Sequence, residues 1–374
     1  MDAYRALLST AQNETGLSDF GDQSFMEGLQ ILASALQNEA KLNATGEHLL
    51  TGRIVSSLKT RLQVEDWYKR HPEIDQEIIK APLIGISLPR TGSTALSFLL
   101  AEDPNARSLR SWESAQPCPP PSTVKGVDPR LGIEHSRPKG AQAHVPSSVT
   151  GPAECQELMA LDFKSQIYLA FAQIPSYAAW LQNADLTSTY EYEKRVLKLL
   201  QWGYPTMPWR LKAPSHLLYM EHLNAAFPDA KFVMTHRDPT DVMLSVVHLY
   251  ADYNSKLSDD IDLHYPARLN IETWSEGIRR AMAFRANGND HRFFDIDFRT
   301  MQQDPIGEVK ALYQWLGEPV SEAFETGMRN WWANNAENRE VLAKPDPATY
   351  GLDLEAVRPL FAEYTRKAAV WTKR

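Results

Sequence analysis

The stretch LIGISLPRTGSTALSFLLAED, residues 83–103, decides the fold of this chain. Its first six residues are mostly aliphatic and lie between two prolines, which is typical of a strand that is covered on both faces of a sheet. A turn at residues 89–94 and an apolar helix follow. Gly92 lets the backbone of this turn approach an oxyanion, and the start of the helix favours negative charge. We therefore predict an anion-binding turn for a phosphate or sulfate group.

This turn differs from the usual nucleoside-triphosphate loop. The GxxxxGK[ST] pattern needs a lysine directly after its second glycine, to reach the β- and γ-phosphates. In this chain Ser93 follows Gly92, and the cation of the turn is Arg90, which precedes the glycine. The missing lysine argues against a nucleotide kinase or NTPase on a degenerate phosphate loop, which we keep as the alternative function.

A second stretch, AKFVMTHRDPTDVMLSVVHLY at residues 230–250, again has the order strand, charged corner and helix. Arg237 ends the apolar run, and Ser245 lies eight residues later, two turns into the helix. Both side chains can face one anion. The structural alternative is a capped helix start, with Asp238 as the N-cap and Ser245 at the edge of the core.

Together these stretches resemble the sulfotransferases that use 3′-phosphoadenosine 5′-phosphosulfate (PAPS). LPRTGST at 88–94 matches the loop for the 5′-phosphosulfate, and RDPTDVMLS at 237–245 matches the Arg-x7-Ser pattern for the 3′-phosphate. WRLKAPSH at 209–216 and YGLD at 350–353 are further matches. Their order and spacing agree from about residue 20 to the end. The chain looks most like the broad bacterial group with a helical N-terminal extension.

The resemblance implies a role for each matching residue. It implies PAPS as the co-substrate, adenosine 3′,5′-bisphosphate (PAP) as the product, and Lys212 as the cation nearest the transferred group. Arg237 and Ser245 are expected to clamp the 3′-phosphate. The 5′-phosphosulfate is expected to lie against Arg90, Thr91, Gly92, Ser93 and Thr94.

The general base stays open between a carboxylate and a histidine. Glu113 lies close to where a related sulfotransferase branch carries a catalytic glutamate, although it can instead hold Arg110 or Arg90. His144 is the rival, because a neutral imidazole in the acceptor-side loop is a competent base without any shift of its pKa. His216 follows Lys212 by four residues and is a third candidate.

The whole chain has the pattern of an α/β protein. Strands expected at 209–212, 230–235 and 291–296 alternate with helices, which predicts a P-loop-like three-layer fold with a central parallel sheet flanked by helices. Residues 1–80 are expected to form a helical N-terminal extension, and residues 81–374 the sulfotransferase α/β domain. A loop-rich insertion at about 114–153 is expected to border the acceptor. We also expect a helix over 154–172 and a loop over 330–347.

Composition limits the partners and the cofactors. A net charge of −8 argues against nucleic acid or an anionic membrane surface. Cys118 and Cys155 fit a reducing compartment as unpaired thiols. No metal-ligand spacing stands out, so we expect metal-independent chemistry. No secretory or membrane-spanning segment is visible, so we expect a soluble, cytoplasmic enzyme for a small apolar acceptor with a hydroxyl or amine. The oligomeric state stays open, and a non-catalytic binding module is the third class of function.

Overall fold

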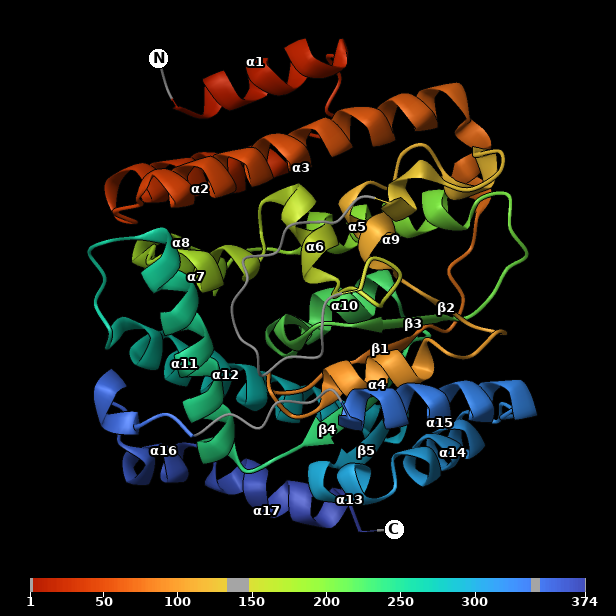
Figure 1. The fold of residues 1–374 in the computed structure, drawn as a ribbon, viewed down its shortest axis with the longest axis vertical. Helices are drawn as coiled ribbons and strands as arrows, with labels where there is room; N and C mark the ends of the chain where they lie inside the picture. The colour runs from red at the N-terminus through yellow and green to blue at the C-terminus, as the bar shows by residue number, and fades with distance from the viewer. Residues whose placement is uncertain (1–2, 133–147, 338–343, 374) are drawn as a thin grey trace.

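The computed structural model describes residues 3–132, 148–337 and 344–373. A five-stranded sheet with the order β2-β3-β1-β4-β5 lies at its centre, and every neighbouring pair of strands is parallel (Figure 1). The predicted parallel sheet is therefore confirmed. The strands are β1 (Leu83–Gly85), β2 (Arg107–Ser108), β3 (Trp209–Lys212), β4 (Lys231–His236) and β5 (Phe293–Asp297).

The two faces of the sheet belong to two different hydrophobic cores. Successive residues of a strand point to opposite faces, so neighbours in the sequence separate. Leu83, Val233 and Phe294 pack into the smaller core, whereas Ile84 and Phe232 pack into the larger one. The helices that contribute to the smaller core are α4 (Ser93–Leu100), α13 (Phe298–Gln303), α14 (Pro305–Leu316) and α15 (Glu322–Glu337). Those that contribute to the larger core include α9 (Thr187–Gln201), α10 (Met220–Ala226), α11 (Pro239–Leu257) and α12 (Tyr265–Phe284).

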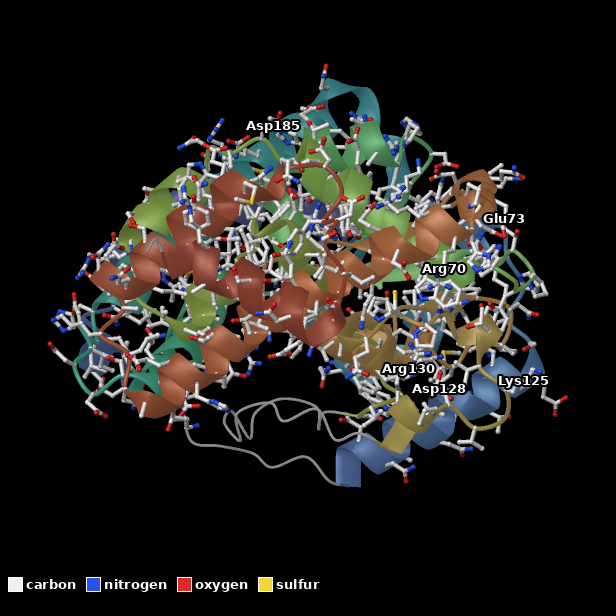
Figure 2. All side chains as sticks on the ribbon, turned by 90° about the horizontal axis from the view of Figure 1, so that it is seen from above. Arg70, Glu73, Lys125, Asp128, Arg130 and Asp185 are labelled. Atoms are coloured by element: carbon white, nitrogen blue, oxygen red, sulfur yellow. The ribbon has the colours of Figure 1, made fainter. Side chains whose placement is uncertain are left out.

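Three N-terminal helices form a further layer against the larger core, as the sequence predicts (Figures 1 and 2). The apolar residues that repeat every three or four positions are the buried ones, among them Phe25, Leu29 and Leu32. Leu50 and Ile54 are buried in the same way along the longest helix. The three helices are α1 (Ala3–Thr15), α2 (Phe25–Asn38) and α3 (Ala44–Arg70).

Shorter elements connect these layers, and no helix among the described residues is long and apolar enough to cross a membrane. The remaining α-helices are α5 (Ser111–Ala115), α6 (Gln156–Met159), α7 (Ile167–Phe171), α8 (Pro175–Leu181), α16 (Leu354–Leu360) and α17 (Ala362–Trp371). The single turns are η1 (Pro72–Gln76), η2 (Pro121–Thr123), η3 (Pro129–Gly132), η4 (Ala160–Asp162), η5 (Pro214–Leu218), η6 (Arg285–Asn289), η7 (Asp290–Arg292) and η8 (Pro347–Tyr350).

One helix prediction and one loop prediction are wrong in their extent. The expected helix over 154–172 is broken into α6, η4 and α7, because Phe163 adopts a positive φ of 54° that ends η4. The first residues of the loop expected over 330–347 are helical, because α15 runs to Glu337. Trp331 stacks on Phe98 of α4 with ring centroids 5.1 Å apart, and this tertiary contact anchors the end of α15.

A fully buried arginine joins the N-terminal helices to the rest of the chain. Arg61 of α3 donates to the carbonyl oxygens of Phe20, Asp22 and Leu161 at 3.1–3.3 Å. Its guanidinium also lies 3.5 Å from the carboxylate of Asp162, and both side chains have no exposed surface. Because a buried charge needs all of its partners, this cluster fixes α3 against η4.

We expect Arg61→Ala to lower the free energy of unfolding by about 3–5 kcal/mol, because it leaves three carbonyls without their donor and removes a buried charge beside Asp162. Arg70→Ala is the matched control: Arg70 lies on the same helix and pairs with Asp66, but it is half exposed. The control should cost less than about 1 kcal/mol. Urea denaturation followed by circular dichroism measures both, and equal losses would contradict the role given to Arg61.

Candidate active site

The turn after β1 has the backbone of an anion cradle. Arg90 and Gly92 both have positive φ angles, of 64° and 88°, and α4 begins directly after Gly92. The first N–H groups of a helix have no partner within the helix, so they are available to a bound anion. A Cβ atom on Gly92 would lie 2.6 Å from Met301 and 3.0 Å from Phe298. The turn therefore requires glycine for its conformation and for its packing.

The corner after β4 meets this turn. Arg237 follows β4 and donates from Nη1 to the carbonyl oxygen of Arg90 at 3.0 Å. Arg90 in turn donates from Nε to Ser245 Oγ of α11 at 2.8 Å. Asp238 caps α11 by accepting from the N–H of Thr240 at 2.8 Å. Residues 90, 237 and 245, which are far apart in the sequence, thus form one contact group.

The topology of the sheet explains this meeting. β1 and β4 are neighbours, but the chain leaves β1 towards β2 and leaves β4 towards β5, on opposite sides of the sheet. In open parallel sheets a crevice forms outside the carboxyl ends of two such strands, and ligands bind there. The two corners lie at this position.

The hydroxyl of Thr91 is used inside the protein. Thr91 is fully buried, and its Oγ1 donates to the carbonyl of Leu88 at 2.9 Å and lies 2.6 Å from Thr235 Oγ1. Thr235 in turn contacts Ser87 Oγ at 2.9 Å. This chain of hydroxyls ties the turn to β4, so Thr91 supports the cradle from below.

Lys212 enters the same region from the end of β3. Its main chain is in register with Gly85 of β1, and a Cβ on Gly85 would lie 2.9 Å from Lys212 Cγ. The absence of a side chain at Gly85 lets the lysine cross the end of β1. Its Nζ then donates to Thr94 Oγ1 at 3.4 Å and to Glu154 Oε1 at 2.5 Å.

Glu154 is a site residue to which the sequence analysis gives no role. Its side chain is 36% exposed while it pairs with the buried Lys212. Burial raises the pKa of the Tyr250 hydroxyl, and the Glu154 carboxylate raises it further. Glu154 reaches Lys212 because the main-chain N–H of Cys155 donates to the carbonyl of Lys212 at 2.9 Å. No spacing rule reveals this contact between segments 58 residues apart (212 − 154).

The other base candidates have different surroundings. Glu113 of α5 accepts from Arg107 Nη2 at 2.6 Å and from the N–H of Arg110 at 3.1 Å, and its side chain is 5% exposed. It lines a separate hollow of about 530 Å³ beside β2. His216 is fully buried, and burial lowers its pKa to about 3. His144 lies outside the described residues.

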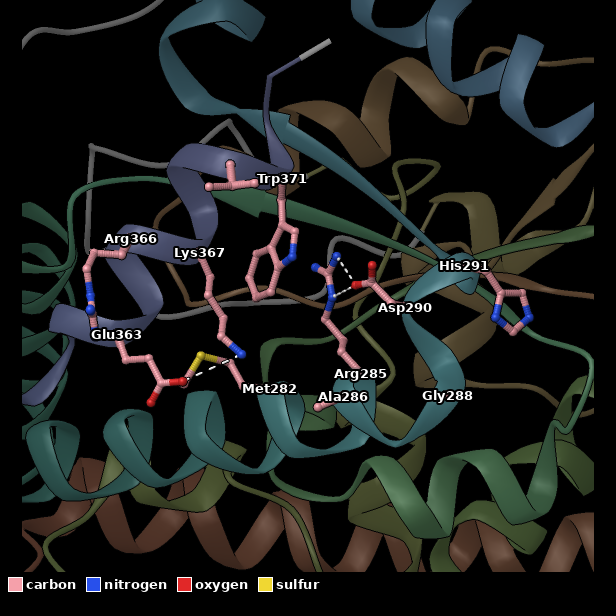
Figure 3. A pocket seen from close by; sticks show the side chains of 11 residues that line it. Met282, Arg285, Ala286, Gly288, Asp290, His291, Glu363, Arg366, Lys367 and Trp371 are labelled. Atoms are coloured by element: carbon pink, nitrogen blue, oxygen red, sulfur yellow. Dashed lines mark hydrogen bonds and ion pairs between the residues drawn. The ribbon is translucent and has the colours of Figure 1, made fainter.

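A larger hollow of about 830 Å³ lies between α12 and α17 and contains none of the predicted site residues (Figure 3). Four of its charged side chains form two ion pairs: Arg285 lies 2.7 Å from Asp290, and Lys367 lies 3.5 Å from Glu363. The unusual backbone and the convergent cations instead favour the crevice at β1 and β4 as the functional site.

Comparison with known proteins finds relatives of this chain. A family model described as "Sulfotransferase family" matches residues 82–322. The omega-hydroxy-beta-dihydromenaquinone-9 sulfotransferase Stf3 of Mycobacterium tuberculosis, and that of Mycobacterium bovis, are 27% identical over 133 residues. That match covers 34% of this chain and 33% of each relative. The aligned part of the chain therefore spans about a third of the length of each relative.

Two solved structures are similar over nearly their whole length. Sulfotransferase STF9 from Mycobacterium avium has 31% identity and a TM-score of 0.88, with 98% of this chain and 97% of that chain covered. Sulfotransferase STF1 from Mycobacterium tuberculosis has 30% identity and a TM-score of 0.85, with 97% and 100% covered.

We expect Gly92→Ala to destabilise the protein by roughly 2–4 kcal/mol, because alanine resists a positive φ and its Cβ meets Met301. Gly288→Ala is the control, since Gly288 has a φ of +84° but open space around it. The control should cost only about 1–2 kcal/mol. Thermal denaturation of both variants measures the difference, and equal costs would show that the packing around residue 92 yields.

Proposed function

The chain belongs to the sulfotransferase family, and on this premise we propose that it moves a sulfuryl group from PAPS to a small acceptor. The observation that carries the proposal is the contact of the two corners through Arg237, Arg90 and Ser245. PAPS has an anionic group at each end of its ribose, and a plain nucleoside diphosphate lacks the 3′-phosphate. A site with two clusters of donors, one at each corner, suits such a ligand.

Each corner has its own role in donor binding. The 5′-phosphosulfate lies against the turn, where Arg90, Ser93, Thr94 and the first N–H groups of α4 offer donors. The 3′-phosphate lies between Arg237 and Ser245. Arg237 suits this role because a guanidinium forms paired hydrogen bonds with phosphate oxygens.

The transfer is an in-line displacement at sulfur. A new bond forms between sulfur and the acceptor oxygen or nitrogen, while the bond between sulfur and the bridging phosphate oxygen breaks and PAP leaves. Lys212 contacts Thr94 of the turn, and in this proposal its ammonium neutralises the charge that develops on the leaving oxygen. A base removes the proton of the acceptor.

The base candidates from the sequence are Glu113, His144 and His216. The contacts in the structure favour a further candidate, Glu154. Glu154 touches Lys212 and is partly exposed, so an acceptor hydroxyl has access to both groups. Glu113 is held by Arg107 and its side chain is only 5% exposed, so an acceptor has less access to it than to Glu154. A carboxylate near the reacting oxygen is an adequate general base.

The acceptor is expected to be small and apolar, with a hydroxyl or amine. The curated relative Stf3 is named for an omega-hydroxy-dihydromenaquinone, which carries such a hydroxyl. The kinase alternative gains no support from the described turn, because Ser93 occupies the place of the lysine that a terminal phosphate requires.

We expect PAP to bind more tightly than ADP, and Arg237→Ala to weaken PAP by roughly 10- to 100-fold through loss of a charged hydrogen bond. ADP affinity should change little in this variant. Arg279→Ala, on the exposed face of α12, is the control and should leave both affinities unchanged. Isothermal titration calorimetry measures all of them. Equal affinity of the unaltered protein for PAP and ADP would contradict the proposed donor site.

We expect Glu154→Gln to lower kcat by roughly 10²- to 10⁴-fold, because the amide cannot accept a proton. PAP affinity should stay within a few-fold of the original. Glu113→Gln is the isosteric comparison and should lower kcat by less than about 10-fold. The assay uses labelled PAPS and an acceptor found by screening phenols, sterols, lipids and glycans. If Glu113→Gln abolished turnover while Glu154→Gln did not, the base would be Glu113. If the screen found sulfation of a charged glycan alone, the proposal of an apolar acceptor would be contradicted.

A further inference from the structure

A buried cluster of metal-ligand residues lies directly behind the Lys212–Glu154 pair. Cys155 follows Glu154, Glu193 lies on α9, and His216 lies on η5. One ligand atom of each side chain lies within 4.8 Å of the other two. All three residues are at most 1% exposed. The sequence separations of 38 residues (193 − 155) and 23 residues (216 − 193) match no metal motif, so sequence analysis could not detect this group.

The polar atoms of this cluster lack ordinary partners. Neither carboxylate oxygen of Glu193 has a nitrogen or oxygen hydrogen-bond partner among the described residues, and the same holds for His216 Nε2. The side chains are fully buried, so bulk solvent does not satisfy these atoms. The Glu193 carboxyl group lies within hydrogen-bond reach of the Cys155 thiol. Three buried atoms without a nitrogen or oxygen partner in one place suit a bound group.

The histidine has the support that metal-binding histidines need. His216 Nδ1 lies 2.9 Å from the hydroxyl of the buried Tyr190. When Nδ1 donates to this oxygen, the tautomer is fixed and Nε2 keeps its lone pair for a metal ion. Such a second contact orients most histidine ligands and strengthens their binding.

The charges of the cluster also suit a divalent cation. A thiolate and a carboxylate together would carry two negative charges, which a divalent cation neutralises within the interior.

We propose that Cys155, Glu193 and His216 bind a zinc ion, with an internal water as the fourth ligand that tetrahedral zinc needs. Sulfur, imidazole nitrogen and carboxylate oxygen are the ligands that zinc takes in proteins. Ligand atoms around a tetrahedral zinc ion lie roughly 3.3–3.8 Å apart, so the three side chains need to move by only about 1 Å. Binding releases one proton from the thiol and one from the carboxyl group. The expectation of no metal is therefore revised for this buried cluster, whereas the proposed sulfuryl transfer stays metal-independent.

The ion would join three segments of the chain. It connects the segment that carries Glu154 to α9 and to the turn that follows Lys212. Because the site is closed to solvent, the ion enters as the protein folds. Loss of the ion is expected to loosen the support of the Lys212–Glu154 pair without removing any group that touches the substrate.

The test uses the full chain expressed in medium supplemented with Zn²⁺, then freed of loosely bound metal by dialysis. Elemental analysis should find one zinc ion per chain. Protein produced with Co²⁺ should show the near-ultraviolet absorption of a thiolate–cobalt bond, which requires no variant that might fail to fold. Cys155→Ser should lose this absorption, and Cys118→Ser, which removes the other buried cysteine, should keep it.

Two outcomes would overturn the proposal. The first is substoichiometric zinc together with no thiolate–cobalt absorption in the unaltered protein, which would leave the cluster as a neutral hydrogen-bonded group. The second is an equal loss of absorption in Cys118→Ser, which would assign the metal to other residues. PAP affinity of the metal-free protein, measured by calorimetry, tests the proposed donor site separately, so failure of one proposal does not imply failure of the other.

Discussion

The site depends on one constraint, the parallel pairing of β1 with β4. This pairing brings together two corners that are about 150 residues apart, and the contact of Arg237 with the carbonyl of Arg90 is its direct result. The Arg237 guanidinium also lies 3.8 Å from the Asp241 carboxylate of α11. The corner of β4 therefore positions the turn of β1 through a charged side chain.

The unusual backbone of the turn is held in place by its surroundings. Non-glycine residues with positive φ cost energy, and Arg90 is one of them. The buried hydroxyl chain through Thr91 and Thr235 fixes the turn from below, and Phe298 and Met301 pack against Gly92. The cradle is thus formed before any ligand arrives, which reduces the conformational cost of binding.

The sequence predicted those parts of the site that depend on residues close together along the chain. A strand followed by a glycine turn and a helix is visible in the sequence, and so are Lys212 at a strand end and Arg237 at a helix start. Glu154 was not visible, because its position depends on the pairing of Cys155 with Lys212 across the fold. The same limit explains the helix errors: the positive φ of Phe163 and the stacking of Trp331 are tertiary effects.

The buried guanidinium of Arg61 limits how α3 can move to admit an acceptor. Its donors hold the carbonyls of Phe20, Asp22 and Leu161, and the guanidinium itself is fully buried. If α3 swung outward, an ionised group would have to leave all of these partners at once, at a cost far above thermal energy. The long helix α3 of Figure 1 is therefore fixed in place against η4. Any gate through which an acceptor passes must be hinged in another part of the molecule.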